Sequence, residues 1–149
     1  MKIYYREKSG GIEILRCFGI EGRVEIPGMI EDKLVVSAAP YAFSSHMEEK
    51  EELKNACLWE VSDGLGFGRE EHVLAGNDVE EIAFPHTLKE IGRYIFYGCG
   101  NLRKLEFSDS LMQIGCGAFT GCHALEKLTV HMRQGKKSGV KEMLGEMCR

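Results

Sequence analysis

The fold is decided by residues 79–101, VEEIAFPHTLKEIGRYIFYGCGN, and by residues 102–124, LRKLEFSDSLMQIGCGAFTGCHA, which repeat them. A third copy begins at residues 125–130, LEKLTV. The copies align without gaps at a step of 23 residues, so that Phe96 corresponds to Phe119 and Cys99 to Cys122. A sequence repeat of this length is typical of a solenoid, in which each repeat forms one coil.

Each copy starts with an apolar residue, two variable ones, an apolar residue, one variable and one apolar. The last two apolar positions are two residues apart, as one face of a β-strand requires. A strand of about five residues cannot bury that face alone, so we expect the copies to stack about 4.8 Å apart in a parallel sheet. Ile82, Leu105 and Leu128 should then lie side by side inside. The variable residues should point outward in two ribbons, Glu81-Lys104-Lys127 and Ala83-Glu106-Thr129.

The second half of each copy should return the chain to the core. Leu88 with Ile91, and Leu111 with Ile114, form a second apolar pair in each copy, and the glycine that follows predicts a tight bend. The segments 94–99 and 117–122 are predicted to form one helical turn each on the outer side, with Phe96 and Phe119 pointing inward.

Cysteines at the same step predict a buried ladder of thiols, Cys99 above Cys122. The alternative, a metal site that adds Cys116 and His123, lacks the paired Cys-x-x-Cys ligand turns of zinc sites. The even count of six cysteines permits disulfides, but free thiols that behave as small hydrophobes are the favoured interpretation.

Two of these segments, Ile91–Leu102 and Ile114–Leu125, resemble the BspA-type leucine-rich repeat, in which Ile-Gly-x-x-Ala-Phe-x-x-Cys-x-x-Leu recurs. The resemblance extends over residues 79–130 and, more loosely, over residues 23–43, whereas residues 44–69 depart from it. It implies a bacterial solenoid used in protein–protein contact, often at the cell surface, with no shared catalytic residues.

We therefore expect one α+β domain over residues 1–149, a leucine-rich-repeat solenoid with short parallel strands, short helical turns and caps at both ends. Residues 1–22 are predicted to form an N-terminal hairpin cap around a Gly-Gly turn, and residues 23–43 a divergent repeat with five extra residues after Pro27. Residues 44–78 are an irregular insert with a helix from Ser45 to Cys57. Residues 79–130 are the regular repeats, and residues 131–149 are a C-terminal helical cap.

Near the end of the insert the repeat pattern returns in degraded form. The 23-residue step places Val73 where Phe96 lies in the next copy, and Gly76 where Cys99 lies. The chain could also be a fragment of a longer protein.

Composition excludes some functions. Hydrophobic residues make up 44% of the chain and charged residues 28%, as in soluble globular proteins. A net charge of −4 disfavours a nucleic-acid partner, which requires a basic face. No apolar run approaches a membrane span, and residues 1–6 lack the apolar block of a secretory signal. We therefore predict a cytoplasmic protein, with the cell surface as the alternative if the chain is a fragment.

Other candidate sites are weaker. Gly64, Gly66 and Gly68 miss the spacing of a dinucleotide loop and indicate a flexible loop. The basic residues between Arg133 and Lys141 are interpreted as a solvated linker. Trp59 is either local core or an exposed binding anchor, and core is favoured.

The sequence predicts a non-enzymatic module that binds another protein, without metal or cofactor. The partner-facing residues are predicted to be those of the two ribbons, namely Glu81, Lys104, Glu106, Lys127 and Thr129. The alternative function is a structural scaffold segment of a larger bacterial protein with no ligand of its own. An enzyme that uses a cysteine–histidine pair is the least favoured hypothesis, because nothing in the sequence sets a base against a thiol.

Overall fold

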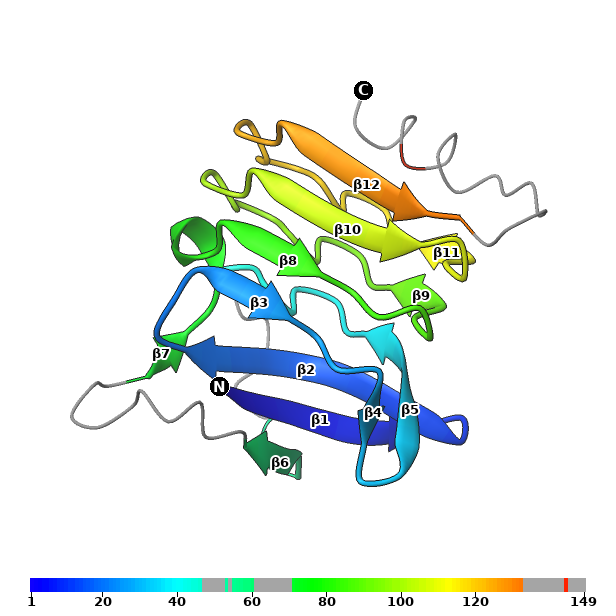
Figure 1. Cartoon of the computed structure of the whole chain (residues 1–149). Coiled ribbons are helices and arrows are strands. Elements are labelled where there is room, and N and C mark those ends of the chain that lie inside the picture. Colours follow the sequence, from blue (N-terminus) through cyan, green and yellow to red (C-terminus); the bar gives the residue numbers. More distant parts are fainter. Residues whose placement is uncertain (47–52, 54, 61–70, 133–143, 145–149) are drawn as a thin grey trace.

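Short parallel strands stack coil upon coil along one side of the molecule (Figure 1). This computed structural model describes residues 1–46, 53, 55–60, 71–132 and 144. The four-stranded sheet has the order β12-β10-β8-β3, with β3 Arg23–Glu25, β8 Glu81–Ala83, β10 Lys104–Ser108 and β12 Lys127–His131. Its register pairs Leu105 with both Ile82 and Leu128, and Ile82 with Val24. The predicted parallel stacking of the repeats is therefore confirmed.

A second sheet lies behind the first and includes the N-terminal cap (Figure 1). Its main path has the order β11-β9-β5-β2-β1-β6. The strands on that path are β1 Lys2–Lys8, β2 Gly11–Gly19, β5 Lys33–Ala38, β6 Cys57–Glu60, β9 Glu90–Ile91 and β11 Gln113–Ile114. Off this path, β4 (Met29–Ile30) pairs with β5, and β7 (His72–Val73) pairs with β2. The coils of β3, β8 and β10 each supply one strand to each sheet, and the apolar core lies between the sheets.

Aromatic rings and thiols form ladders through the core. The Phe96 ring lies 6.0 Å from that of Phe43 and 5.6 Å from that of Phe119, measured between centroids. The Cys99 thiol donates to the Phe43 carbonyl with 3.2 Å between S and O, and the Cys122 thiol donates to the Phe96 carbonyl at 3.4 Å. The predicted cysteine ladder is confirmed, and each thiol ties its coil to the one before.

The N-terminal hairpin is also confirmed. Strands β1 and β2 pair antiparallel around Ser9 and Gly10, which both have positive φ. The inner face of the hairpin contributes Ile3, Ile12 and Ile14, which are fully buried. The hairpin therefore closes one end of the solenoid core, because β2 also pairs with β5 of the first coil.

The first coil is interrupted by the insert and then completed. The Gly76 N–H donates to the Phe43 carbonyl with 2.8 Å between N and O, just as the Cys99 N–H donates to the Phe96 carbonyl at 3.0 Å. Gly76 thus takes the predicted position of Cys99. The predicted equivalence of Val73 with Phe96 is wrong, because Phe43 occupies that position and Val73 pairs with β2 of the cap.

The remaining features of this coil follow from its extra length. The five extra residues after Pro27 form the β4–β5 hairpin, whose turn residues Glu31 and Asp32 have positive φ. Where the chain leaves for the insert, the buried Arg16 guanidinium donates to the carbonyls of Ala42 and Ser44. The carbonyls at this departure point are therefore hydrogen-bonded rather than buried without partners.

The predicted α+β class is wrong, because the part of the chain described here is a β-solenoid with almost no helix. Its one helical element with assigned bounds is the 3-10 turn η2 (Gly76–Asp78). The outer segments 94–99 and 117–122 are turns. Some of their N–H groups bond back three residues, as Tyr97 N–H does to the Tyr94 carbonyl, and others bond to the next coil. Tyr94 N–H donates to the Cys116 carbonyl at 3.0 Å, and Phe96 N–H to the Ala118 carbonyl at 3.1 Å.

The two predicted longer helices fall mostly on residues outside those that the structure describes. The helix expected from Ser45 to Cys57 is contradicted at its end, where Cys57 begins strand β6, and residues 47–52 and 54 lie outside the described residues. Most of the C-terminal helical cap expected over residues 131–149 also lies outside them. Within that range His131 ends β12, and Leu144 is fully buried in the core.

Glycines at the bends have a different role from the predicted one. A Cβ on Gly92 would lie 2.3 Å from the backbone N of Pro40, and one on Gly115 would lie 2.1 Å from the N of Arg93. Glycine is needed because the neighbouring coil passes at contact distance, and neither residue has a positive φ.

Candidate functional site

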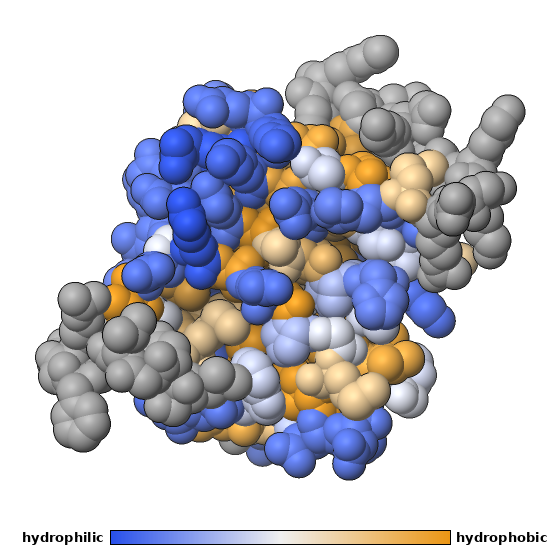
Figure 2. Space-filling view, viewed as in Figure 1, coloured by the Kyte–Doolittle hydropathy of each residue, from blue (hydrophilic) through white to orange (hydrophobic). Residues whose placement is uncertain are grey.

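The outward side of the four-stranded sheet carries two rows of side chains in strand register. We call this surface the outer face, and it includes the outward residues of β3 as well as those of the regular repeats. Figure 2 shows it as mainly hydrophilic, with apolar surface visible between the polar side chains. Its rows are Arg23-Glu81-Lys104-Lys127 and Glu25-Ala83-Glu106-Thr129.

The first row is mostly cationic. Glu81 lies between two cations, with its carboxylate oxygens 3.4 Å from Arg23 Nε and 3.6 Å from Lys104 Nζ. Lys127 extends the row on β12 and is exposed. Ion pairs this open to solvent contribute little to stability, about 0–1 kcal/mol each. The row is therefore available to interact with another molecule at small cost to the fold.

The second row is acidic around a small residue. Ala83 lies between Glu25 on β3 and Glu106 on β10. Glu106 is about half exposed, and its Oε2 lies 3.6 Å from His131 Nε2, a contact that is an ion pair only when the imidazole is protonated. The outer face thus places one carboxylate on each side of the small Ala83 side chain.

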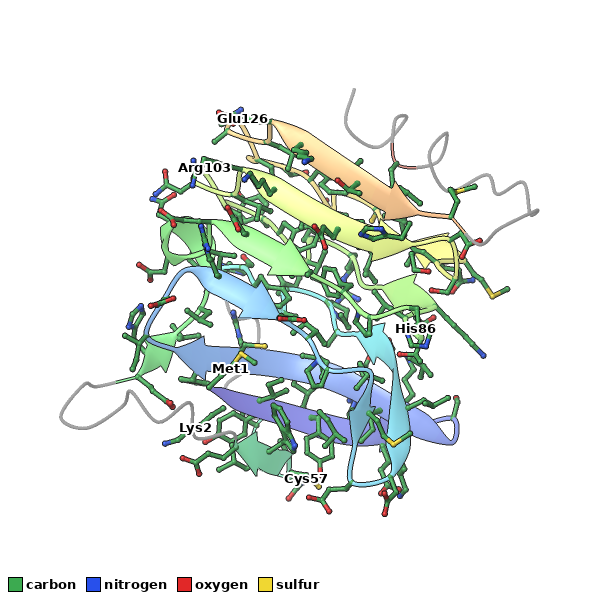
Figure 3. The ribbon with its side chains drawn as sticks, viewed as in Figure 1. Met1, Lys2, Cys57, His86, Arg103 and Glu126 are labelled. Atoms are coloured by element: carbon green, nitrogen blue, oxygen red, sulfur yellow. The ribbon has the colours of Figure 1, made fainter. Side chains whose placement is uncertain are left out.

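The structure places all five predicted partner-facing residues on this face, at adjacent register positions. The sequence analysis missed Arg23 and Glu25, because the insert separates their strand from the regular repeats. A signal was present, since Val24-x-Ile26-Pro27 repeats the pattern Ile82-x-Phe84-Pro85. Figure 3 shows Arg103 and Glu126 just before β10 and β12, at the opposite end of the strands from His86.

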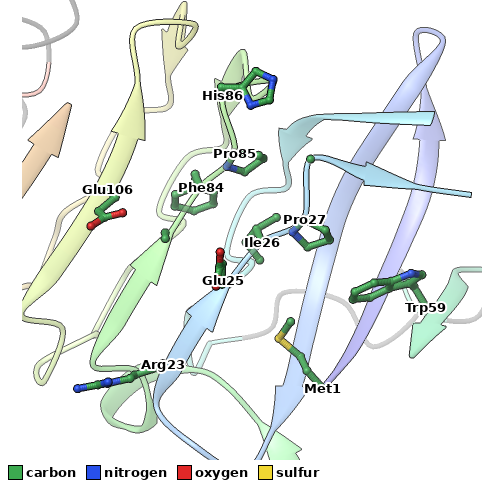
Figure 4. A pocket seen from close by; sticks show the side chains of 12 residues that line it. Met1, Arg23, Glu25, Ile26, Pro27, Trp59, Phe84, Pro85, His86 and Glu106 are labelled. Carbon is green, nitrogen blue, oxygen red and sulfur yellow. The ribbon is translucent and has the colours of Figure 1, made fainter. Parts of the chain in front are cut away.

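A cavity of about 680 Å³ adjoins the outer face where the sheet meets the N-terminal cap. We call it the Trp59 groove. Figure 4 shows Trp59 and Met1 on the cap side, with residues of β3, β8 and β10 on the other. A smaller hollow of about 310 Å³ over the same strands shares Glu25, Ala83 and Glu106 with it. The residues that line the groove include Met1, Glu25, Pro27, Trp59, Ala83 and Glu106, together with the basic side chains of Arg23 and His86.

The Trp59 side chain is partly buried, in agreement with the favoured core interpretation. It lies on β6 opposite Ile3 and packs against the core, yet it also lines the groove. An indole that is partly buried presents a rigid apolar surface at a low entropic cost, which is why tryptophan is frequent at binding anchors.

A second polar cluster lies on the other sheet. The buried Glu13 carboxylate accepts from Arg6 Nε at 2.5 Å and from the Ser37 hydroxyl at 3.2 Å. Lys8 Nζ donates to Glu90 at 2.9 Å. The hydrogen bond with Glu90 raises the pKa of Lys8, and the bond from Lys8 lowers the pKa of Glu90. Since these groups bond to one another, the cluster joins the cap to the coils.

The cysteines separate into buried and exposed thiols. Cys17 and Cys99 are buried as predicted, and burial raises the pKa of each thiol to about 12. Cys122 is half-buried, whereas Cys57 and Cys116 are exposed, contrary to the prediction. Within the described ranges no group of three or more His, Cys, Asp or Glu side chains could hold a metal ion. The remaining cysteine, at position 148, lies outside them, as do the Gly64–Gly68 loop and the basic residues 133–141.

No helix among the residues placed here is long and apolar enough to cross a membrane. The cytoplasmic location stays a prediction.

The comparisons with known proteins agree with this architecture. Residues 70–138 match the family described as "BspA type Leucine rich repeat region (6 copies)". Comparison with curated proteins gave no match.

Three solved bacterial structures are similar in fold. A leucine rich cell surface protein from Faecalibacterium prausnitzii A2-165 has 19% identity and a TM-score of 0.56, and the match covers 87% of this chain but 30% of that protein. A leucine-rich repeat protein from Bacteroides ovatus has 20% identity and a TM-score of 0.48, covering 89% of this chain and 41% of that one. The T. pallidum leucine rich repeat protein has 14% identity and a TM-score of 0.46, covering 97% and 92%.

Proposed function

On the premise that residues 70–138 match the BspA type leucine rich repeat region, we propose that the chain is a protein–protein interaction module that binds its partner with the outer face. The observation that carries the proposal is the register of the outer face. It extends the two rows across four strands and adds Arg23 and Glu25 to the predicted residues.

The physical properties of the face support this function. Stacked coils provide an extended and rigid surface on which side chains can vary without loss of the core. Lys104 and Glu106 are about half exposed, so a partner can reach both. Alternating charges of this kind favour one orientation of a partner and speed encounter more than they add affinity. We propose a protein partner rather than nucleic acid because the net charge is −4.

A binding role also fits the thiols better than catalysis does. The nucleophile of a cysteine enzyme is the thiolate, which needs a lowered pKa. Burial moves the pKa of Cys17 and Cys99 in the opposite direction, to about 12.

The test is capture of partners from a bacterial lysate by the immobilised full chain. The triple variant Lys104→Ala, Glu106→Ala and Lys127→Ala should lose the captured proteins. A matched variant of exposed residues away from the outer face, Lys89→Ala, Gln113→Ala and Thr120→Ala, should retain them. Equal capture by the two variants would move the binding surface elsewhere.

The second candidate is a scaffold segment of a larger protein. It is favoured by the neighbour from F. prausnitzii, of which this chain spans about 30%. If the wild-type chain captured no protein beyond those retained by the empty matrix, the scaffold role would be preferred.

A further inference from the structure

The Trp59 groove combines an apolar wall with a pair of carboxylates. On the cap side Met1 and Trp59 face Pro27 across the opening, as Figure 4 shows. On the sheet side Glu25 and Glu106 stand on β3 and β10. The volume of about 680 Å³ lies within the range of sites that enclose small ligands or several side chains.

The two carboxylates can reach one ligand together. Their strands are separated by β8 alone, so their backbones are about 10 Å apart, two spacings of about 4.8 Å. The residue between them on β8 is Ala83, whose methyl group leaves the space over the sheet open. Both side chains can therefore lean toward a cation placed above Ala83.

The charges of these two groups are not neutralised by strong partners. Glu81 interacts with both Arg23 and Lys104, whereas among the residues placed here Glu25 has no hydrogen-bond or ion-pair partner. Among the described residues the Glu106 carboxylate has one charged neighbour within ion-pair distance, His131, and that contact is ionic only with a protonated ring. A cation from outside would supply the missing partner to both carboxylates.

We propose that the Trp59 groove binds an arginine side chain presented by an extended segment of a partner protein. A guanidinium is planar and offers N–H donors on more than one edge, so it can bridge Glu25 and Glu106. It also stacks on aromatic faces, and its methylene stem packs on apolar surface such as Met1 and Trp59. The inference rests on the proposed function and names the chemistry that the partner presents.

Trp59 is the single tryptophan of the chain, so its fluorescence reports on the groove. The full chain is titrated with the peptide acetyl-Leu-Arg-Leu-amide and, as the uncharged isostere, with acetyl-Leu-citrulline-Leu-amide. We expect a saturable change with the arginine peptide and at least about 10-fold weaker binding of the citrulline peptide, because a charge-assisted hydrogen bond is lost. Raising the salt concentration from about 0.02 M to about 0.3 M should weaken the binding of the arginine peptide more than the binding of the citrulline peptide.

Two double variants test whether the peptide binds to the groove carboxylates or to negative charge elsewhere on the surface. The double variant Glu25→Gln, Glu106→Gln should bind the arginine peptide about 10-fold more weakly or worse. The control Glu80→Gln, Glu126→Gln removes the same charge outside the groove and should change the affinity less than about 2-fold. All four glutamates are exposed, so both variants should keep the wild-type circular dichroism.

Equal binding of the two peptides, equal effects of the two variants, or no saturation up to about 10 mM peptide would overturn the arginine site. These outcomes leave the proposed function standing if the triple variant still loses its captured proteins. The reverse result, a peptide response of the wild type with unchanged capture by the triple variant, would reject the outer face as the capturing surface. Because that variant lacks Glu106, the captured proteins would then not be bound through the groove carboxylates either.

Discussion

The most decisive perturbation concerns which residue fills the aromatic position of the first coil. The sequence offers two residues, Phe43 at the end of the divergent repeat and Val73 from the 23-residue step, and the structure places Phe43 there. We expect Phe43→Ala to destabilise the fold far more than Val73→Ala.

The magnitude follows from burial. Phe43 is fully buried, with its ring centroid 6.0 Å from that of Phe96 and 6.1 Å from that of Phe84. Deleting a core phenylalanine costs about 3–5 kcal/mol, and the loss of two ring pairs puts this case toward the upper end. Val73 is half-buried and loses two methyl groups, so about 1 kcal/mol is expected.

The assay is urea unfolding of the full chain followed by far-UV circular dichroism, with free energies of unfolding from the linear extrapolation. A loss of about 4 kcal/mol is a large part of a typical total of about 5–15 kcal/mol. If Phe43→Ala leaves too little folded protein, Phe43→Leu should still show a loss of about 1–2 kcal/mol. A Val73→Ala variant that is destabilised as much as Phe43→Ala would refute the assignment of the first coil.

Three further predictions concern other parts of the fold. Gly92→Ala should lower the free energy of unfolding by about 1–3 kcal/mol, because its Cβ would meet the backbone of the preceding coil; urea unfolding checks this. In the native protein Cys116 should react with a maleimide while Cys99 stays unlabelled in intact-protein digests, and labelling of both at similar rates would contradict the burial of the ladder. The hydrogen bond from Lys8 lowers the pKa of Glu90, so the pair stabilises the fold fully above the unfolded-state pKa of about 4.3 and loses this effect as the pH falls below that value. The difference in free energy of unfolding between wild type and Glu90→Gln, measured from pH 7 to pH 3, should therefore shrink below about pH 4.3.

The regular repeats were predictable because their signal is local and repeated. Ile82, Leu105 and Leu128 recur at one step with an alternation of period two, and only stacking in a parallel sheet buries all three. The same argument predicted the outward direction of Lys104 and Glu106. In these cases one physical requirement, burial of a strand face, leaves a single arrangement.

The expectation of helical turns was wrong because sequence spacing does not say where a backbone N–H finds its acceptor. At Tyr94 and Phe96 the acceptors are carbonyls of the next coil, which come within reach only after the coils stack. Gly92 shows the same limitation, since its glycine is required by the backbone of Pro40, 52 positions earlier in the chain.

The sequence by itself determined the coil length, the inward and outward faces of the strands, and the positions of the aromatic and thiol ladders, because each follows from a pattern that recurs in consecutive 23-residue copies. Only the tertiary structure decided that the first coil closes from Phe43 to Gly76 across the insert and that β3 adds Glu25 to the outer face. It also decided that Trp59 returns beside that face to form the groove. These features depend on pairings between segments far apart in the chain, whose partners are selected by packing and backbone hydrogen bonds rather than by local pattern.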